Sequence, residues 1–290
     1  MTNPTELPTG YEIGPMTRSE ASILESWAAD EGWNPGVNDM DVAWEADPDA
    51  FIALRKDGKL AGGGTIIAYK GKAGFMGLFI MRKDIRRQGL GRILWRERLR
   101  RLRERLQPDA PIGMDGVFDM VPFYAAGGFK LLYRDLRYEG KADGTLDPAA
   151  IPLDEIGWAN VAAYDLAVSG IDRPDFMRRW LSQPGGNGFA VQRDDAVSGY
   201  GFIRPCRSGF KIGPLYADDA GIAERLLNSL LATVQGKPVA LDVPEPNGPA
   251  VALAEERGWT QSFGCARMLY GPSATPPVDR VYGVTSFEFG

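Results

Sequence analysis

The feature of this 290-residue sequence that most constrains its fold is a repeated order of elements. Apolar runs, helical periodicity and turn residues predict strand, helix, strand, helix, strand over residues 74–138. The same order is predicted over residues 209–270. Strands and helices that alternate in this way pack as layers around one core. We therefore expect a duplicated α/β domain.

Turn-forming residues place the boundaries of the two copies. Gly140, Gly144 and Pro148 make the stretch after residue 139 the best linker candidate. We assign residues 1–140 to the first domain, 141–150 to a linker, 151–272 to the second domain and 273–290 to a C-terminal tail.

The chain has no histidine, which excludes Ser-His and Cys-His nucleophile pairs and makes the usual zinc sites unavailable. Its two cysteines, Cys206 and Cys265, do not make a disulfide framework and fit a reducing compartment. No apolar run approaches the roughly 18 residues of a membrane-spanning helix, and residues 1–10 lack the pattern of a signal peptide. We expect a cytoplasmic protein with no metal and no membrane partner.

A turn near the middle of the first domain carries the strongest functional signal. Arg86-Arg87-Gln88-Gly89-Leu90-Gly91 lies between an apolar strand, Gly74 to Met81, and a helix of about residues 90–106. Glycines let the backbone approach a ligand and turn its N–H groups inward, and a helix N-terminus adds a positive dipole end. Arg86, Arg87 and Arg92 add positive charge. The turn is therefore a candidate pyrophosphate site, and the alternative is a tight connection with solvated arginines.

The helix after this turn is rich in arginine and could also indicate nucleic-acid binding. Residues 82–105 contain eleven basic and three acidic side chains. The sequence pI is about 5.1, however, and aromatic residues for base stacking are not interleaved with the arginines. We consider nucleic acid an unlikely partner and interpret the charge run as a solvated helix face that also attracts an anionic cofactor.

Two spaced motifs resemble the GNAT superfamily of N-acetyltransferases. The family's pyrophosphate motif is Gln/Arg-x-x-Gly-x-Gly/Ala, which Arg86 to Gly91 matches. Its next landmark, a tyrosine followed by three residues and Gly-Phe, is matched by Tyr124 to Phe129. The stretch Gly32 to Gly36, with Asp39, also resembles tandem bacterial GNAT proteins. The resemblance implies two GNAT-like domains, each a twisted, mostly antiparallel sheet flanked by helices.

The resemblance also implies a cofactor and its site. Acetyl-coenzyme A would bind the first domain through the strand residues Phe79, Ile80 and Met81 and the turn residues Arg86, Arg87, Gln88, Gly89, Leu90, Gly91 and Arg92. Tyr124 would protonate the departing thiolate, which suits a phenol with a pKa of about 10. Without the motif, Tyr124 would be interpreted as a core aromatic residue.

The acceptor site is less well defined. With no histidine, candidates for the base that deprotonates an amine are Asp39, Asp115, Asp119 and Glu31, or a water chain that leads to one of them. Trp33, Asn34 and Asp39 lie where the family's variable loop lines the acceptor pocket. The alternative for this stretch is a Pro-Gly turn with Trp33 packed in the core. Residues 205–207 and 281–290 are further candidates for the wall of this pocket.

The resulting prediction is an acetyl-coenzyme A-dependent N-acetyltransferase that acts on a small-molecule amine by direct attack in a ternary complex. One alternative is acetylation of a protein lysine or N-terminus, and another is a non-catalytic acyl-coenzyme A sensor. We expect a monomer or a homodimer. The second domain should lack its own cofactor site, because Asp218 and Asp219 stand where the first domain has arginines and Ala254 stands at the position of Tyr124.

Overall fold

The structure, a computed structural model, describes residues 6–272 and 276–290. The first half contains β1 (Tyr11–Pro15), α1 (Arg18–Asp30), α2 (Asp39–Ala46), β2 (Phe51–Lys56), β3 (Lys59–Tyr69), β4 (Ala73–Met81), α3 (Leu90–Glu104), β5 (Ile112–Gly116), α4 (Val121–Ala125) and β6 (Lys130–Lys141). The second half contains β7 (Ile151–Pro152), α5 (Trp158–Ser169), α6 (Pro174–Trp180), β8 (Asn187–Arg193), β9 (Ala196–Pro205), β10 (Phe210–Ala217), α7 (Ala220–Ala232), β11 (Pro238–Pro244), α8 (Gly248–Glu255), β12 (Thr260–Tyr270) and β13 (Val281–Gly283). The predicted duplicated order of elements is confirmed.

Local sequence explains several of these boundaries. Thr17 and Glu20 form a reciprocal capping box that begins α1. Asp57 and Gly58 both have positive φ, 48° and 73°, which is the backbone of a two-residue hairpin turn between β2 and β3. These short-range signals fix the elements that carry the site.

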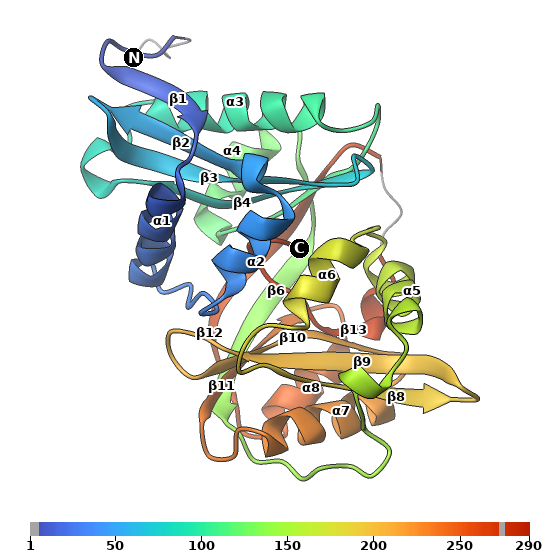
Figure 1. Ribbon diagram of the computed structural model, residues 1–290. Coiled ribbons are helices and arrows are strands. Elements are labelled where there is room, and N and C mark those ends of the chain that lie inside the picture. The colour runs from blue at the N-terminus through green and yellow to red at the C-terminus, as the bar shows by residue number, and fades with distance from the viewer. Residues whose placement is uncertain (1–5, 273–275) are drawn as a thin grey trace.

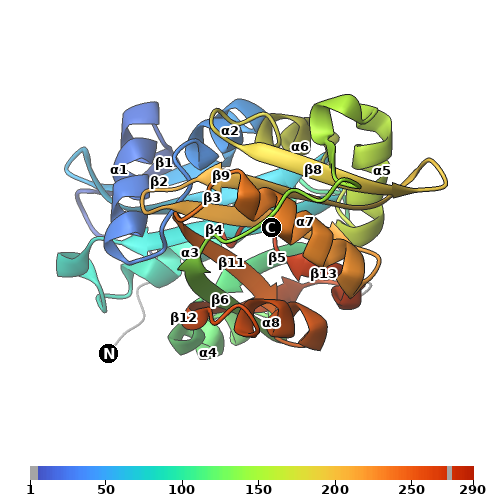
Figure 2. The same cartoon turned by 90° about the horizontal axis from the view of Figure 1, so that it is seen from below.

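Helices separate into an outer and an inner layer (Figure 1). α3 covers the outer face of the first half and α7 the outer face of the second half. α1, α2, α5 and α6 lie between the two halves. Figure 2, which views the molecule from the side of the second half, shows α7 and α8 on this side and the inner helices along the upper edge of the view.

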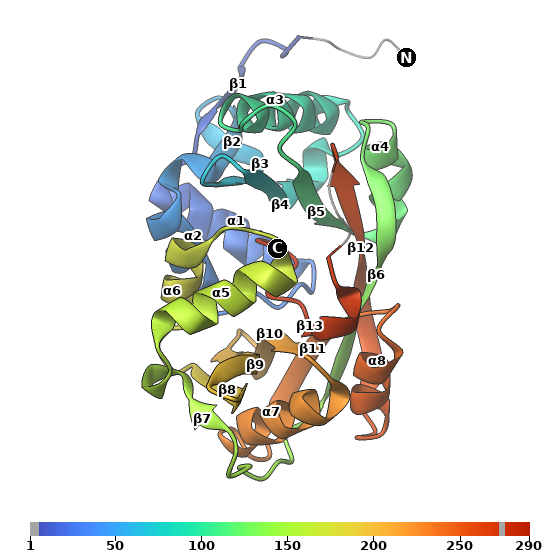
Figure 3. The same cartoon turned by 90° about the vertical axis from the view of Figure 1, so that its right-hand side faces the viewer.

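The two halves exchange their last strands. β6 begins in the first half and ends against β11 of the second half, from Asp135↔Pro244 to Lys141↔Pro238. β12 begins in the second half and ends against β5 of the first half. β6 and β12 also pair with each other, and Figure 3 shows both running along one side of the molecule from one half to the other. The strand order is therefore one continuous sheet, β1-β2-β3-β4-β5-β12-β6-β11-β10-β9-β8-β7, with β13 paired to β10.

This exchange changes the expected domain division. Residue 140 lies at the end of β6, but that strand is already paired with β11, so sequence and spatial boundaries do not coincide. The residues between Ala142 and Ala150 form an irregular connection without helix or strand.

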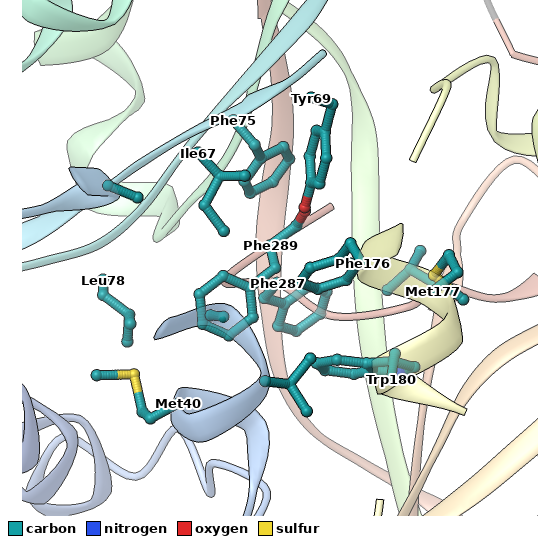
Figure 4. Packing of buried hydrophobic residues seen from close by; sticks show 14 of the residues in the cluster. Met40, Ile67, Tyr69, Phe75, Leu78, Phe176, Met177, Trp180, Phe287 and Phe289 are labelled. Atoms are coloured by element: carbon teal, nitrogen blue, oxygen red, sulfur yellow. The ribbon is translucent and has the colours of Figure 1, made fainter. Parts of the chain in front are cut away.

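A shared core also joins the halves. One cluster of buried apolar side chains combines residues of β3 and β4 with residues of α6 and of the C-terminal segment 281–290. Figure 4 shows Tyr69, Phe75, Phe176, Trp180 and Phe289 of this cluster packed against one another. Segment 281–290 is buried along its whole length. It is therefore part of the interior and not a peripheral tail.

Candidate active site

A cavity of about 790 Å³ opens where β4 and β5 separate. These parallel strands pair only at Gly74↔Ile112 and Phe75↔Gly113. Beyond that point Leu78 has a positive φ of 50°, and the pairing of β3 with β4 shifts register nearby. Because β3 pairs with the other edge of β4, the backbone groups of Phe79 to Met81 on the edge toward β5 are available to a ligand.

The turn before α3 forms the outer end of this cavity. Gly89 is the N-cap of α3 in left-handed conformation, with φ 84°, and Arg87 also has a positive φ of 63°. No side chain caps the helix, so the N–H groups of its first turn have no side-chain acceptor. Gly89 and Gly91 line the cavity, whereas the Leu90 side chain is buried in the core beneath. Such a nest at a helix N-terminus binds anions, phosphates above all.

The basic residues of the turn have different partners. Arg86 donates hydrogen bonds to the Met81 carbonyl at 2.8 Å and to Glu31 Oε1 at 2.6 Å, which ties the turn to α1. Arg87 and Arg92 are exposed, line the cavity, and form no ion pair with the described residues. Gln88 also lines the cavity and donates to the Asp84 carbonyl at 3.2 Å. Arg87 and Arg92 therefore remain available to an anionic ligand.

Tyr124 lies on α4 and lines the cavity. It is 4% exposed, and its ring packs directly on Gly116, where an added Cβ would lie 2.5 Å from Tyr124 Cε2. Burial raises the pKa of Tyr124 to about 12, although the nearby Arg98 guanidinium opposes this shift. The phenol is therefore protonated at neutral pH and can act as a proton donor.

Arg98 is buried against β3 and β4, so the interpretation of the whole charge run as a solvated helix face was wrong for this residue. It is 0% exposed and donates from Nη2 to the Thr65 carbonyl at 2.6 Å and the Gly77 carbonyl at 2.7 Å. Burial lowers the pKa of Arg98 to about 10. Arg98 lies three residues after Trp95 and four before Leu102, which both face the sheet. Residues at this spacing share one face of a helix, so the sequence contained a signal that Arg98 is buried.

Three of the residues predicted near the acceptor line the cavity. Trp33 does so, and its carbonyl accepts from Arg137 Nη1 at 2.8 Å. Glu31 also lines the cavity, and its carboxylate is paired with Arg86. Asp115 also lines it and receives two hydrogen bonds from Arg267, at 2.7 and 2.8 Å, while burial raises the pKa of Asp115 to about 6.

The remaining predicted residues lie outside the cavity lining. Asn34 exchanges hydrogen bonds with the backbone of Ser208. Asp39 is 1% exposed and forms a two-bond ion pair with Arg204, at 2.7 and 2.9 Å. Asp119 is exposed on the turn before α4. Asn34 and Asp39 thus connect the first half to the second, next to the backbone pairing of Gly36 with Cys206.

Among the cavity residues that were not assigned individually from the sequence, four come from segments distant from the predicted site. Phe263 and Cys265 come from β12, and Phe287 and Glu288 come from the C-terminal segment. Burial raises the pKa of the Cys265 thiol well above its usual value. No local motif marks these residues, because they reach the first half only through the strand exchange and the burial of segment 281–290.

The corresponding gap in the second half is filled by the chain itself. β10 and β11 pair in parallel from Phe210↔Val239 to Ile212↔Leu241 and then separate. β13 enters there: it pairs with β10 at Leu215↔Gly283, and Val284 N–H donates to the Asp242 carbonyl at 2.9 Å.

The helix that follows β10 also lacks a free N-terminus. The N-cap of α7 is Asp219, whose carboxylate accepts the Ile222 N–H at 2.9 Å. Ala254, at the position of Tyr124, is buried. The second half therefore has its strand gap occupied and its helix N-terminus already capped by a carboxylate.

Comparison with known families identifies the fold and the class of activity. The model of the "Acetyltransferase (GNAT) family" matches residues 19–127, and that of an "Acetyltransferase (GNAT) domain" matches residues 161–283. The chain belongs to the GNAT superfamily. It is a tandem member, and its class of activity is acyl transfer.

Individual relatives resemble the chain over nearly its whole length. The holothin acyltransferase of Pseudoalteromonas sp. is 25% identical over 95% of this chain and 93% of its own. A putative acetyltransferase from Pyrococcus horikoshii has the same fold, with a TM-score of 0.84, 23% identity and 98% of each chain covered. A tandem GNAT protein from the clavulanic acid biosynthesis pathway gives a TM-score of 0.62 at 16% identity, over 91% of this chain and all of its own.

The described residues contain no group of His, Cys, Asp and Glu arranged to hold a metal ion. None of the helices in the described part of the chain is long and apolar enough to span a membrane.

Proposed function

We propose that the protein transfers an acetyl group from acetyl-coenzyme A to the amine of a small molecule, within the first-half cavity. The observation that carries this proposal is the joint placement of an uncapped helix N-terminus, an open strand edge and a buried protonated tyrosine around one cavity. The second half has no equivalent opening at its own strand gap, because β13 fills it.

The residues present fit the thioester co-substrate. The first-turn N–H groups of α3, together with Arg87 and Arg92, would hold its pyrophosphate, and the free edge of β4 would accept its amide-rich arm. When bound, acetyl-coenzyme A supplies an activated acyl carbon. Leu90 would contribute through its backbone N–H alone, since its side chain lies in the core.

Tyr124 would act as the general acid that protonates the leaving sulfur. Its raised pKa keeps the proton on the phenol at neutral pH, and its burial places the transfer away from bulk water. Direct attack by the amine is favoured over an acyl-enzyme, because Cys265, the cysteine in the cavity lining, has a pKa well above that of a free thiol and is a poor nucleophile.

The composition of the inner wall supports a small acceptor over a protein chain. Phe263, Phe287 and Glu288 are contributed by the other half and by the buried C-terminal segment, so part of the cavity wall comes from outside the first half and would restrict the space for an acceptor. The relative named holothin acyltransferase is in keeping with a small-molecule acceptor. Acetylation of a protein lysine or N-terminus would need a groove that admits a peptide backbone.

The test is the substitution Tyr124→Phe, assayed by thiol release against a panel of amines. We expect kcat to fall by about 10²-fold, the usual scale for loss of a general acid, with an unchanged melting shift on addition of acetyl-coenzyme A. Retention of full activity would exclude Tyr124 as the acid. A wild-type protein that binds acetyl-coenzyme A but acetylates no amine would favour the sensor alternative.

A further inference from the structure

The C-terminal segment is guided into the first half by contacts with the second half. After β13, Arg173 holds the segment by donating to Thr285 Oγ1 at 2.9 Å and to the Gly290 oxygen at 2.5 Å. Tyr69 of β3 donates to the Phe289 carbonyl at 2.6 Å. Figure 1 shows the C-terminus between the two halves. The first-half strand gap borders the cavity, whereas the equivalent gap in the second half is filled by β13, the start of a segment that continues into the first half.

This path brings Glu288 against the part of β4 that borders the cavity. A Cβ added to Gly77 would overlap the Glu288 carbonyl, so glycine at position 77 allows the segment to approach. Gly77 is also the residue whose carbonyl Arg98 binds, one residue before the bulge at Leu78. Glu288 and Tyr124 line the same cavity.

The Glu288 side chain is buried without a cation. It is 5% exposed, and its carboxylate accepts one hydrogen bond among the described residues, from Ser286 Oγ to Oε2 at 2.5 Å. No lysine or arginine of the described chain lies within 4 Å of it. Arg137 and Arg204 lie near enough to attract Glu288, but each already forms an ion pair with another carboxylate. Buried charges in proteins are normally paired. A cationic group of a ligand on the cavity side of Glu288 would therefore supply the direct ion pair that no described residue makes.

The other acids that line the cavity already have such partners. Asp115 is paired with Arg267 through two hydrogen bonds, and Glu31 with Arg86. The buried arginines on the second-half side are also paired: Arg137 with Asp242, Arg204 with Asp39 and Arg173 with Asp165. Among the acids of this cavity in the described residues, Glu288 is the one without a cationic partner.

We propose that Glu288 binds the ammonium group of the acceptor and takes its proton before attack. This inference rests on the proposed function. The ammonium R–NH3⁺ would transfer one proton to the Glu288 carboxylate and become the free amine. The amine nitrogen then forms a bond with the thioester carbonyl carbon, the carbon–sulfur bond breaks, and Tyr124 gives its proton to the sulfur. The acylated nitrogen then loses its second proton to the Tyr124 oxygen, which restores the phenol, and Glu288 releases its proton to water.

The same wall defines the class of acceptor. Phe263 and Phe287, with ring centroids 6.2 Å apart, flank the cavity beside Glu288, and Arg137 covers both rings at 5.4 and 5.2 Å. Aromatic side chains next to a carboxylate favour a primary amine attached to a flat or apolar body over a polyamine or an amino acid with its own carboxylate. The structure assigns the acceptor to small monoamines with an apolar body.

The test compares Glu288→Gln with wild type. Glutamine keeps the shape and the ability to accept from Ser286 but cannot take a proton or neutralise an ammonium. The matched control is Glu104→Gln, an acid on the exposed end of α3 with 62% side-chain exposure. The probes are 2-phenylethylamine and its uncharged analogue 2-phenylethanol, added to protein saturated with coenzyme A. The readouts are melting temperature and the kinetics of thiol release from acetyl-coenzyme A.

We expect 2-phenylethylamine, and not the alcohol, to raise the melting temperature of wild type and Glu104→Gln but not of Glu288→Gln. The KM for the amine should rise about 10- to 100-fold in Glu288→Gln, the scale for a lost charged hydrogen bond, with the KM for acetyl-coenzyme A unchanged. The rate of Glu288→Gln should also increase about tenfold per pH unit below the pKa of the free amine, because deprotonation then occurs in solution.

An equal amine-induced shift in Glu288→Gln and wild type would overturn the inference, and so would the absence of a shift in wild type that binds coenzyme A. An unchanged pH–rate profile would refute the proton-accepting role. Failure of wild type to bind acetyl-coenzyme A at all would instead refute the proposed function.

Discussion

The ion pair between Asp39 and Arg204 gives the sharpest test of how the two halves are joined. The side chains of Asp39, at the start of α2, and Arg204, on β9, are 2% and 0% exposed. The guanidinium also lies 4.3 Å from the centre of the Trp180 ring. Burial disfavours the charged guanidinium, but Asp39 outweighs this effect and holds the pKa of Arg204 above its usual value. Asp39→Asn keeps the shape and removes the charge, which leaves Arg204 buried without a counter-ion.

The expected loss is about 3–5 kcal/mol of unfolding free energy, the scale for removing one partner of a buried pair. An unfolding entropy of about 2.1 cal/mol/K per residue gives roughly 0.6 kcal/mol/K for a chain of this length, so the melting temperature should fall by about 5–8 °C. Urea denaturation and calorimetry would measure both quantities. The acceptor KM should change little, since Asp39 is outside the cavity lining.

A matched control lies on the same helix. Glu45 of α2 pairs with Arg179 of α6 across the same boundary, but the two side chains are 62% and 47% exposed. Glu45→Gln should change stability by less than ~1 kcal/mol, because solvent screens an exposed pair. If Asp39→Asn were as stable as Glu45→Gln, or if it mainly raised the acceptor KM, the structural interpretation of Asp39 would be wrong.

Two further predictions concern charges near the cavity. Burial raises the pKa of Asp135 well above its usual value, so the folded protein retains a proton there that the unfolded chain loses as pH rises through about 4. The Asp135 contribution to the free energy of unfolding therefore falls as pH rises above that point. Asp135→Asn should remove this decline when stability is measured by urea denaturation from pH 4 to 8. An identical pH dependence of stability in both proteins would refute the prediction. The second prediction concerns the double substitution Arg87→Ala with Arg92→Ala. It should raise the KM for acetyl-coenzyme A about 10-fold or more and make this KM less dependent on salt, with kcat nearly unchanged. An unaffected KM would exclude these arginines from pyrophosphate binding.

The sequence sufficed for what depends on local chemistry. The glycines of the turn, the capping box of Thr17 and Glu20, and the hairpin at Asp57-Gly58 act over a few residues, so their elements form as predicted. The repeat of strand and helix order predicted the duplication. Residues of the turn and Tyr124 line one cavity because they belong to one consecutive strand–helix–strand–helix unit, β4-α3-β5-α4.

Of the two segments named from the sequence as candidates for the pocket wall, 281–290 contributes Phe287 and Glu288 to the cavity lining, whereas 205–207 does not line it. The individual residues of this wall could not be predicted, because they depend on contacts between distant segments. An exchange of β6 and β12 leaves the alternation of each strand unchanged, so no pattern within either strand reveals its partner. Segment 281–290 has no strong periodicity, and its position depends on the gap beside β10 and on Arg173. Asp39 illustrates the same limit, since a carboxylate in an acceptor loop and one in a buried ion pair look alike in sequence.

Calorimetric titration with acetyl-coenzyme A most directly tests the claim that the first-half cavity is the one working site. The account predicts one molecule bound per chain, with binding abolished by Gly89→Asp, because a carboxylate would occupy the anion nest and a side chain at φ 84° is strained. In the described residues of the other half, β13 fills the equivalent gap and Asp219 caps α7, so we expect no second site there. Two molecules per chain, with one still bound by Gly89→Asp, would contradict the account.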